Sequence, residues 1–298
     1  MKVVLLHLLP AALALGLVSC RDRAGTPPPG LLAQTNARTF EVTGVVQELA
    51  ADGRTLVIRH QEISNYMPAM SMPFHARATN EVSGLKPGDA ISFRLVVTAD
   101  ESWIDHVRPT GRLPAAEPGP GPAENPSNGP PIFRLTDIPD FALTNEFGQA
   151  VSLRAFPGRA VALTFFFTRC PLPEYCPRLT KNFQGALQKL AAAAGGPTNF
   201  HFLSISFDPL DTPLLLRAYA RQYRYDSNHW SFITGHPDQI RELARGFGVP
   251  IAAEGAGYNH GFRTAIFDAT GRLQTIWPVG GDMTDQIVAE ITKGAQAH

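Results

Sequence analysis

Five short β-strand patterns follow one another in the first third of the chain. The clearest show a period of two, in which apolar positions alternate with polar ones, as in a strand that buries one face. Asp52-Gly53 and the run 85–89 punctuate them as turns. The five patterns cover residues 40–46, 55–60, 70–74, 90–98 and 102–107. Five short strands in about 70 residues favour an all-β, OB-like five-stranded barrel.

After residue 131 the pattern changes to strands that alternate with helices. Residues 161–167 form an apolar run typical of a buried central strand, and Asp211-Thr212-Pro213 is a helix N-cap signal. A hairpin is expected over 141–153, with its turn at 145–148. The expected strands are 161–167, 200–207, 229–233, 264–267 and 274–278, and the expected helices are 177–194, 213–223, 238–247 and 283–297. This order predicts a three-layer α/β domain of thioredoxin-like type.

Proline- and glycine-rich segments separate these regions. Residues 111–131 are dense in both and predict an interdomain linker. Residues 21–37 lack periodicity and predict a tether. We therefore expect a β-barrel at 38–110 and a thioredoxin-like domain at 132–298.

Residues 1–20 have the features of a secretory signal. Lys2 precedes an apolar run that is short for a membrane span and is interrupted by His7 and Pro10. The ending Leu17-Val18-Ser19-Cys20 resembles a bacterial lipobox. We expect Cys20 to be the acylated first residue of a periplasmic, membrane-anchored lipoprotein; an ordinary signal peptide is the alternative. The formal net charge is zero and no basic run is present, which argues against a nucleic-acid partner.

The chain has three cysteines, and Cys170 and Cys176 form a pair where a strand leads into a helix. Cys176 is expected at the N-cap and Pro177 at the first helical position. The helix dipole there favours a thiolate. Three interpretations remain: a soft-metal site, for which Cu(I) fits best, a redox dithiol, and a static disulfide. The static disulfide is the weakest of the three, because a disulfide across so small a loop contributes little entropy. We place the metal site first and the redox dithiol second.

A site with two sulfur ligands needs a further donor, and His260 is the best candidate. It is expected in the loop just before the strand 264–267, which a thioredoxin-like arrangement brings beside the cysteine turn. A neutral imidazole binds either oxidation state of copper.

Residues 137–297 resemble the Sco/SenC family of thioredoxin-like copper proteins, which are associated with assembly of the dinuclear copper centre of cytochrome c oxidase. The matching segments are 166–171, 176–177, 206–209, 211–213, and His260 with 264–268. The resemblance implies Cys170, Cys176 and His260 as ligands for Cu(I) or Cu(II). Two features depart from the family: five residues rather than three separate the cysteines, and Asn259 replaces an aspartate.

A second cluster of soft donors lies in the expected barrel. Met67, Met70 and Met72 fall within six residues, and Met70 and Met72 are two apart, so on a strand they share a face. Thioethers suit Cu(I), and His60 ends the preceding strand. Core filling is the alternative for these methionines.

Residues 40–108 resemble CusF-like periplasmic copper-binding domains. The matching residues are His60, Pro68, Met70, Met72 and Phe74, with 84–89 downstream. Met67 stands where that family has a tryptophan covering the metal, and it would either add a sulfur or shield the site.

The sequence therefore predicts an extracytoplasmic copper metallochaperone with two soft-metal sites. The expected client is a cuproprotein such as a cytochrome c oxidase subunit, and copper transfer between the domains is a hypothesis that the two sites raise. The competing function is a thiol-disulfide oxidoreductase that uses Cys170 and Cys176 as catalytic residues to keep client cysteines reduced. A copper buffer without a client is a third possibility.

Overall fold

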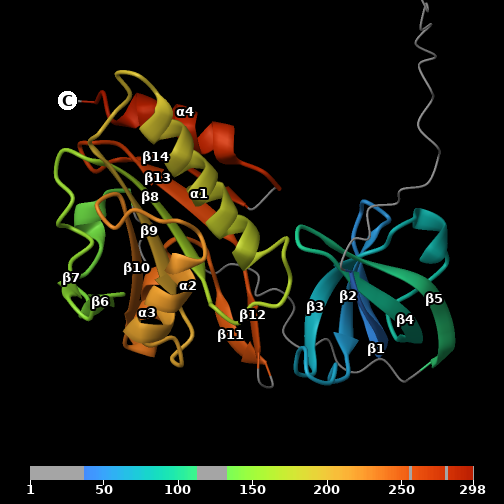
Figure 1. The fold of residues 1–298 in the computed structure, drawn as a ribbon. Helices are drawn as coiled ribbons and strands as arrows, with labels where there is room; N and C mark the ends of the chain where they lie inside the picture. The colour runs from blue at the N-terminus through green and yellow to red at the C-terminus, as the bar shows by residue number, and fades with distance from the viewer. Residues whose placement is uncertain (1–36, 113–132, 255–256, 279–280, 298) are drawn as a thin grey trace, which may run out of the picture. The chain divides into compact units, whose positions relative to one another are not determined.

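The computed structural model describes residues 37–112, 133–254, 257–278 and 281–297 (Figure 1). The expected signal peptide with Cys20, residues 21–36 of the expected tether and residues 113–131 of the expected linker lie outside this part. The chain divides into two units, Met1–Thr35 and Asn36–His298, and both sheets described below belong to the second unit. No helix in the described ranges has the length and apolar character needed to cross a membrane.

The first sheet is antiparallel and contains all five predicted strands, in the order β3-β2-β1-β4-β5 (Figure 1). The elements are β1 (Arg38–Leu49), β2 (Thr55–His60), β3 (Met70–His75), a 3₁₀ turn (Thr79–Glu81), β4 (Asp89–Val97) and β5 (Ser102–Arg112). The expectation of a barrel needs correction, because β3 and β5 do not form a continuous ladder. Only an isolated bridge between Ala76 and Ile104 joins the two ends. Closure requires hydrogen bonding along both edge strands, so this is an open, curved sheet.

The alternation seen in the sequence places one face of this sheet in a hydrophobic core. Leu56 and Ile58 on β2 are fully buried against Ile91 and Phe93 on β4. Gly44 on β1 allows β2 to approach closely, because a Cβ there would lie 2.6 Å from Ile58 Cγ2. The sheet therefore has its own core.

The second sheet has the order β14-β13-β8-β9-β10-β6-β7, with β8, β9 and β10 parallel. This is the thioredoxin-like α/β domain predicted from the sequence. Its strands are β6 (Leu143–Asn145), β7 (Ala150–Val151), β8 (Ala160–Phe166), β9 (Phe200–Ser206), β10 (Trp230–Gly235), β13 (Arg263–Phe267) and β14 (Leu273–Pro278). Its helices are α1 (Cys176–Ala192), α2 (Pro213–Arg221), α3 (Pro237–Gly246) and α4 (Thr284–Gly294), with a 3₁₀ turn at Leu135–Asp137.

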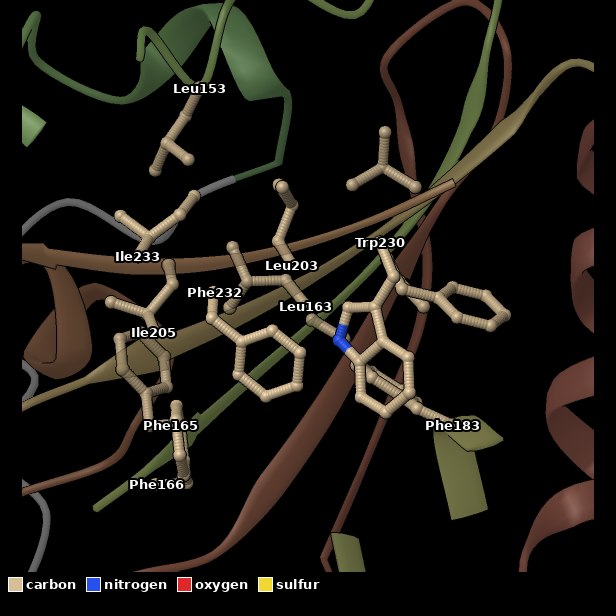
Figure 2. Close-up of a cluster of buried hydrophobic side chains, with 14 of the residues drawn as sticks. Leu153, Leu163, Phe165, Phe166, Phe183, Leu203, Ile205, Trp230, Phe232 and Ile233 are labelled. Carbon is tan, nitrogen blue, oxygen red and sulfur yellow. The ribbon is translucent and has the colours of Figure 1, made fainter. Parts of the chain in front are cut away.

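Helices cover both faces of this sheet. Successive residues of β8 point to opposite faces: Phe166 contacts Tyr219 of α2, whereas Phe165 contacts Phe247 at the end of α3. The helices α1 and α4 lie side by side (Figure 1). Figure 2 shows that the central strands contribute a cluster of large apolar side chains, including Trp230 and Phe232, which Phe183 of α1 joins. The carboxyl end of β8 is thereby fixed in a rigid core, and the cysteine turn begins there.

The sequence analysis did not predict a two-stranded sheet formed by β11 (Ile251–Glu254) and β12 (Gly257–His260). Its strands are only four residues long, too short to give a clear periodicity. His260 therefore ends a strand, and the expectation that it lies in a loop is wrong.

Candidate functional site

The cysteine turn connects the buried strand β8 to α1. Cys176 is completely buried and Cys170 is half-buried, and both are free thiols. The helix starts one residue earlier than expected. Tyr175 is the N-cap, since its carbonyl accepts the hydrogen bond from Leu179 N at 3.0 Å, and Cys176 is the first helical residue. The prediction of Cys176 as N-cap is thus wrong by one position, although the cysteine does lie at the helix start.

The two thiols are chemically unequal. Burial raises the pKa of the Cys170 thiol, but hydrogen bonds from the side chain and backbone of Cys176 outweigh this, and the pKa lies below its ordinary value. Burial raises the pKa of Cys176 well above its ordinary value, and its hydrogen bond to Cys170 raises it further. Cys170 is therefore the more acidic thiol of the pair, and Cys176 donates a hydrogen bond to its sulfur.

Two buried aspartates hold this turn. Asp211 accepts hydrogen bonds from Thr168 N at 2.9 Å, from Thr168 Oγ1 at 2.5 Å and from Ser206 Oγ at 2.6 Å. Asp208 Oδ2 pairs with the guanidinium of Arg169, at 3.0 Å from Nε and 2.6 Å from Nη2. Both residues that precede Cys170 are thus anchored to the end of β9.

Asp208 also reaches the histidine strand. Its Oδ1 accepts a hydrogen bond from the Tyr258 hydroxyl at 3.3 Å and one from Leu210 N at 3.0 Å. With these contacts Asp208 both forms the turn after β9 and orients the cysteine and histidine segments. Asp208 is therefore a positioning residue between Arg169 and Tyr258.

His260 lies among aromatic rings near this turn. Its ring centroid is 4.2 Å from that of Phe262, 4.5 Å from that of Phe207 and 5.8 Å from that of Phe167. Burial lowers its pKa to about 4, so the imidazole is neutral at physiological pH. Its Nδ1 lies 3.0 Å from Gly261 O and donates to it, so the lone pair is on Nε2. A neutral imidazole held in one tautomer is ready to bind a metal.

The structure brings His260 and Cys170 together, because both line one cavity of about 70 Å³. Cys176 lies beside Cys170. In the described part of the chain, no three His, Cys, Asp or Glu side chains stand close enough together to hold a metal ion as they are placed. Two sulfur atoms and a neutral nitrogen are nevertheless a donor set that suits copper.

The methionine run forms β3, and the ladder register brings it next to His60. His60 on β2 pairs directly with Met70, and Ile58 pairs with Met72. Residues opposite each other share a face, so His60, Met70 and Met72 lie on the same face. His60 is buried, and its Nδ1 donates to Gln61 O at 2.7 Å, which leaves the lone pair on Nε2.

The three methionines differ in their surroundings. Met67 is 4% exposed and packs in the hydrophobic core of the first sheet. Met70 and Met72 are half-buried and line the same cavity as Cys170 and His260. The core-filling alternative therefore describes Met67 fully and Met72 in part, since Met72 also packs against that core, while Met70 and Met72 both line the cavity.

Sequence reasoning missed part of the cavity wall. Tyr175 and Phe262 stack with centroids 4.8 Å apart and line the cavity. Tyr175 precedes Cys176 and Phe262 is two residues after His260, but aromatic residues by themselves carry no ligand signal. A further histidine, His201, is buried on β9, with its Nε2 2.9 Å from Ser231 Oγ.

Comparisons with known proteins agree with both resemblances. The family model described as SCO1/SenC matches residues 133–296, and the model described as copper binding periplasmic protein CusF matches residues 39–109. The SCO1 protein homolog of Bacillus subtilis (strain 168) is 30% identical over 110 residues, which are 36% of this chain and 54% of that protein. The chain thus spans about half the length of this relative.

Two solved structures illustrate the likeness. A SCO1/SenC family lipoprotein from Bacillus anthracis is 23% identical, with a TM-score of 0.46 over 52% of this chain and 93% of that chain. Arabidopsis thaliana ScoI with copper bound is 23% identical, with a TM-score of 0.43 over 51% and 96%. Because the SCO1/SenC model matches more than half of the sequence, this chain belongs to the SCO1/SenC family.

Proposed function

We propose that this protein binds copper outside the cytoplasm and delivers it to a cuproprotein, in keeping with its family. The observation that carries the proposal is the convergence of Cys170 and His260 on one cavity, with Cys176 beside Cys170. Thiolate and imidazole are donors that suit copper, and they bind it without a further charged ligand. Cys170, Cys176 and His260 would hold the ion in the thioredoxin-like domain.

The first sheet would hold a second copper ion through His60, Met70 and Met72. Thioether sulfur is neutral and soft, so this donor set favours Cu(I) over Cu(II). The register of β2 and β3, which sets His60 beside Met70, supports this assignment. Met67 would shield the site from the core side rather than bind the metal.

The location and the client belong to the same proposal. The match to a periplasmic copper-binding protein supports an extracytoplasmic location, and Cys20 would attach the chain to the membrane. Within the SCO1/SenC family, the expected client is a copper subunit of cytochrome c oxidase. Cu(I) is the expected cargo at both sites, and Cu(II) is an alternative at the site with two cysteines.

Copper stoichiometry on the reduced chain tests the proposal. The wild type should retain two equivalents of Cu(I) against a chromophoric chelator, and Cys170→Ala and Met70→Ala should each retain one. The matched controls are Ala substitutions of Ser227 and Met283, which the proposal places in neither site. Retention of no copper by the wild type would contradict the proposal, and so would two equivalents in both variants.

A thiol-disulfide oxidoreductase is the second candidate, and the unequal thiols favour it. A Cys170 thiol of lowered pKa with Cys176 beside it is the arrangement of an attacking and a resolving cysteine. Rapid disulfide exchange with a small-molecule disulfide, together with no retention of Cu(I), would support this function. Strong copper retention with slow exchange would support the chaperone.

A further inference from the structure

Four of the five residues between Cys170 and Cys176 contact the domain of the first sheet. Leu172 is 2% exposed and belongs to the hydrophobic core of that sheet, although it lies in the other domain's sequence. The Tyr66 hydroxyl donates to Pro171 O at 2.7 Å, and the Tyr175 hydroxyl donates to Pro73 O at 3.3 Å. The additional length of this turn, which departs from the usual family spacing, is therefore used to attach the two domains.

Polar groups outside the cavity strengthen this contact. Glu174 accepts a hydrogen bond from Ser102 of β5. On α1, Lys181 Nζ lies 2.7 Å from Asp100 Oδ1, and Arg178 Nη2 donates to Asp100 O at 2.9 Å. The contacts of Lys181 and Arg178 are exposed and each contributes little, whereas the hydrogen bond between Ser102 and Glu174 is partly buried. Leu172, the two tyrosines and Glu174 therefore provide most of the specificity.

The attachment places the two candidate ligand sets around one cavity. Met70 and Met72 line it from the first sheet, and Cys170 and His260 line it from the thioredoxin-like domain. Its volume is about 70 Å³, and its remaining lining is largely aromatic and apolar. The two ligand sets therefore face one mostly apolar space.

The charge of this donor set selects the oxidation state. Two thioethers and an imidazole are neutral, and one thiolate carries a single negative charge, so a Cu(I) complex is neutral overall. A Cu(II) complex would retain a positive charge, and burying an uncompensated charge among apolar groups is costly. Among the described residues that line the cavity, none is a carboxylate that could balance it.

We propose that this cavity is a transfer site, in which Cu(I) passes from Met70 and Met72 to Cys170 and His260 without leaving the protein. This inference rests on the proposed function and deepens it. The bonds from copper to the Cys170 sulfur and to His260 form as the two copper–thioether bonds break. Copper stays Cu(I), no electron is transferred, and any proton on the Cys170 thiol goes to water. The bond to Cys176 then forms as the bond from copper to His60 breaks, and the proton of the Cys176 thiol also goes to water.

The test follows copper while the disulfide between Cys170 and Cys176 is reduced to two thiols. The full chain is oxidised so that Cys170 and Cys176 form a disulfide, loaded with one equivalent of Cu(I), and then reduced with a phosphine in the presence of an excess of chelator. If transfer occurs inside the cavity, the wild type keeps its copper and gains the ultraviolet absorption of a copper–thiolate bond.

Leu172→Gln is the variant that should undo the attachment. It places a polar amide in the core of the first sheet, and the two domains then remain joined only through the linker. Copper captured by the chelator should rise about tenfold, because contact between the ligand sets is replaced by diffusion on a tether. Leu210→Gln is the matched control, since Leu210 is 59% exposed in the same domain, and it should behave as the wild type.

Tyr66→Phe provides a second variant that preserves packing and removes only the hydrogen bond to Pro171 O. It should increase capture by a smaller factor than Leu172→Gln, so the conclusion does not depend on how well Leu172→Gln folds. If the wild type loses as much copper as Leu172→Gln during reduction, or if neither variant differs from it, the transfer site is wrong and the proposed function stands. If the oxidised chain and the reduced chain both retain no copper, the proposed function itself fails.

Discussion

The two candidate copper sites are built by different means. In the first sheet, His60 and Met70 are partners in one antiparallel ladder, and their alignment follows from a short connection between adjacent strands. In the thioredoxin-like domain, Cys170 and His260 come from elements 90 positions apart, and buried aspartates fix the backbone of the cysteine turn. The first arrangement is local, whereas the second depends on the whole domain. Damage far from the ligands should therefore affect the second site more than the first.

The largest effect is expected from Asp211→Ala. The substitution leaves Thr168 N, Thr168 Oγ1 and Ser206 Oγ without their acceptor in a buried location. Unsatisfied buried donors cost about 1–3 kcal/mol each, and partial relaxation gives an expected total of about 3–5 kcal/mol in the free energy of unfolding. Denaturant unfolding measures it. Asp285→Ala, an exposed carboxylate on α4, is the control and should change stability by less than about 1 kcal/mol. Equal effects of the two substitutions would show that Asp211 does not hold the turn.

Between pH 7 and pH 5, the stability of the thioredoxin-like domain should depend on pH. Burial, followed by the nearby charge of Arg159, lowers the pKa of His201 to about 4. An unfolded histidine has a pKa of about 6.5, so between these values the unfolded state binds more protons and stability rises with pH. The contribution of His201 is present above about pH 6.5 and is lost as the pH falls toward 4.

Between pH 7 and pH 5 this contribution should fall by about 2 kcal/mol. His201→Asn should reduce the pH dependence of unfolding by that amount. His260 has a similarly lowered pKa, and its contribution remains in this variant. An unaltered slope in His201→Asn would contradict the burial argument.

Asp208→Asn should distinguish the two copper sites. It weakens the contacts to Arg169 and Tyr258, and so loosens both segments that carry ligands of the thioredoxin-like site. Substitutions of groups that orient metal ligands typically reduce affinity by about 10–100-fold. Competition for Cu(I) should show this loss at the cysteine site alone.

Asp105→Asn is the matched control in the first sheet, where Asp105 pairs with Arg94 at 2.7 Å. It should leave the cysteine site unchanged. Equal loss of copper affinity in the two variants would mean that the effect is on overall stability, not on ligand position.

The smallest effect is expected from Lys181→Ala. This lysine forms an exposed ion pair with Asp100, and such pairs contribute about 0–1 kcal/mol. Unfolding should change within that range, and copper retention during reduction should match the wild type. A large increase in copper capture would show that charge pairs, rather than Leu172 and Tyr66, hold the domains together.

Much of the fold could be predicted because its signals are local. The alternation of apolar and polar residues predicted the five strands of the first sheet. The Asp211-Thr212-Pro213 signal correctly predicted the start of α2, where the side chain of the N-cap Thr212 accepts a hydrogen bond from Leu215 N. The open edges of the sheet and the β11–β12 pair could not be predicted. Both depend on hydrogen bonds between distant segments, and a periodicity over four residues does not identify a strand.

The sequence by itself determined which chemistry is available: sulfur and imidazole donors in two clusters, a β region and a thioredoxin-like order of elements. It also showed that the turn between Cys170 and Cys176 is two residues longer than the family pattern, without a reason for the added length. Only the tertiary structure decided what the longer turn contacts, because the burial of Leu172 among side chains of the first sheet depends on contacts between residues about 100 positions apart. The tertiary structure also decided that Met70, Met72, Cys170 and His260 share one cavity. The hydrophobic effect depends on the apolar area that is buried and not on distance along the sequence, so the packing of distant elements determines which side chains meet.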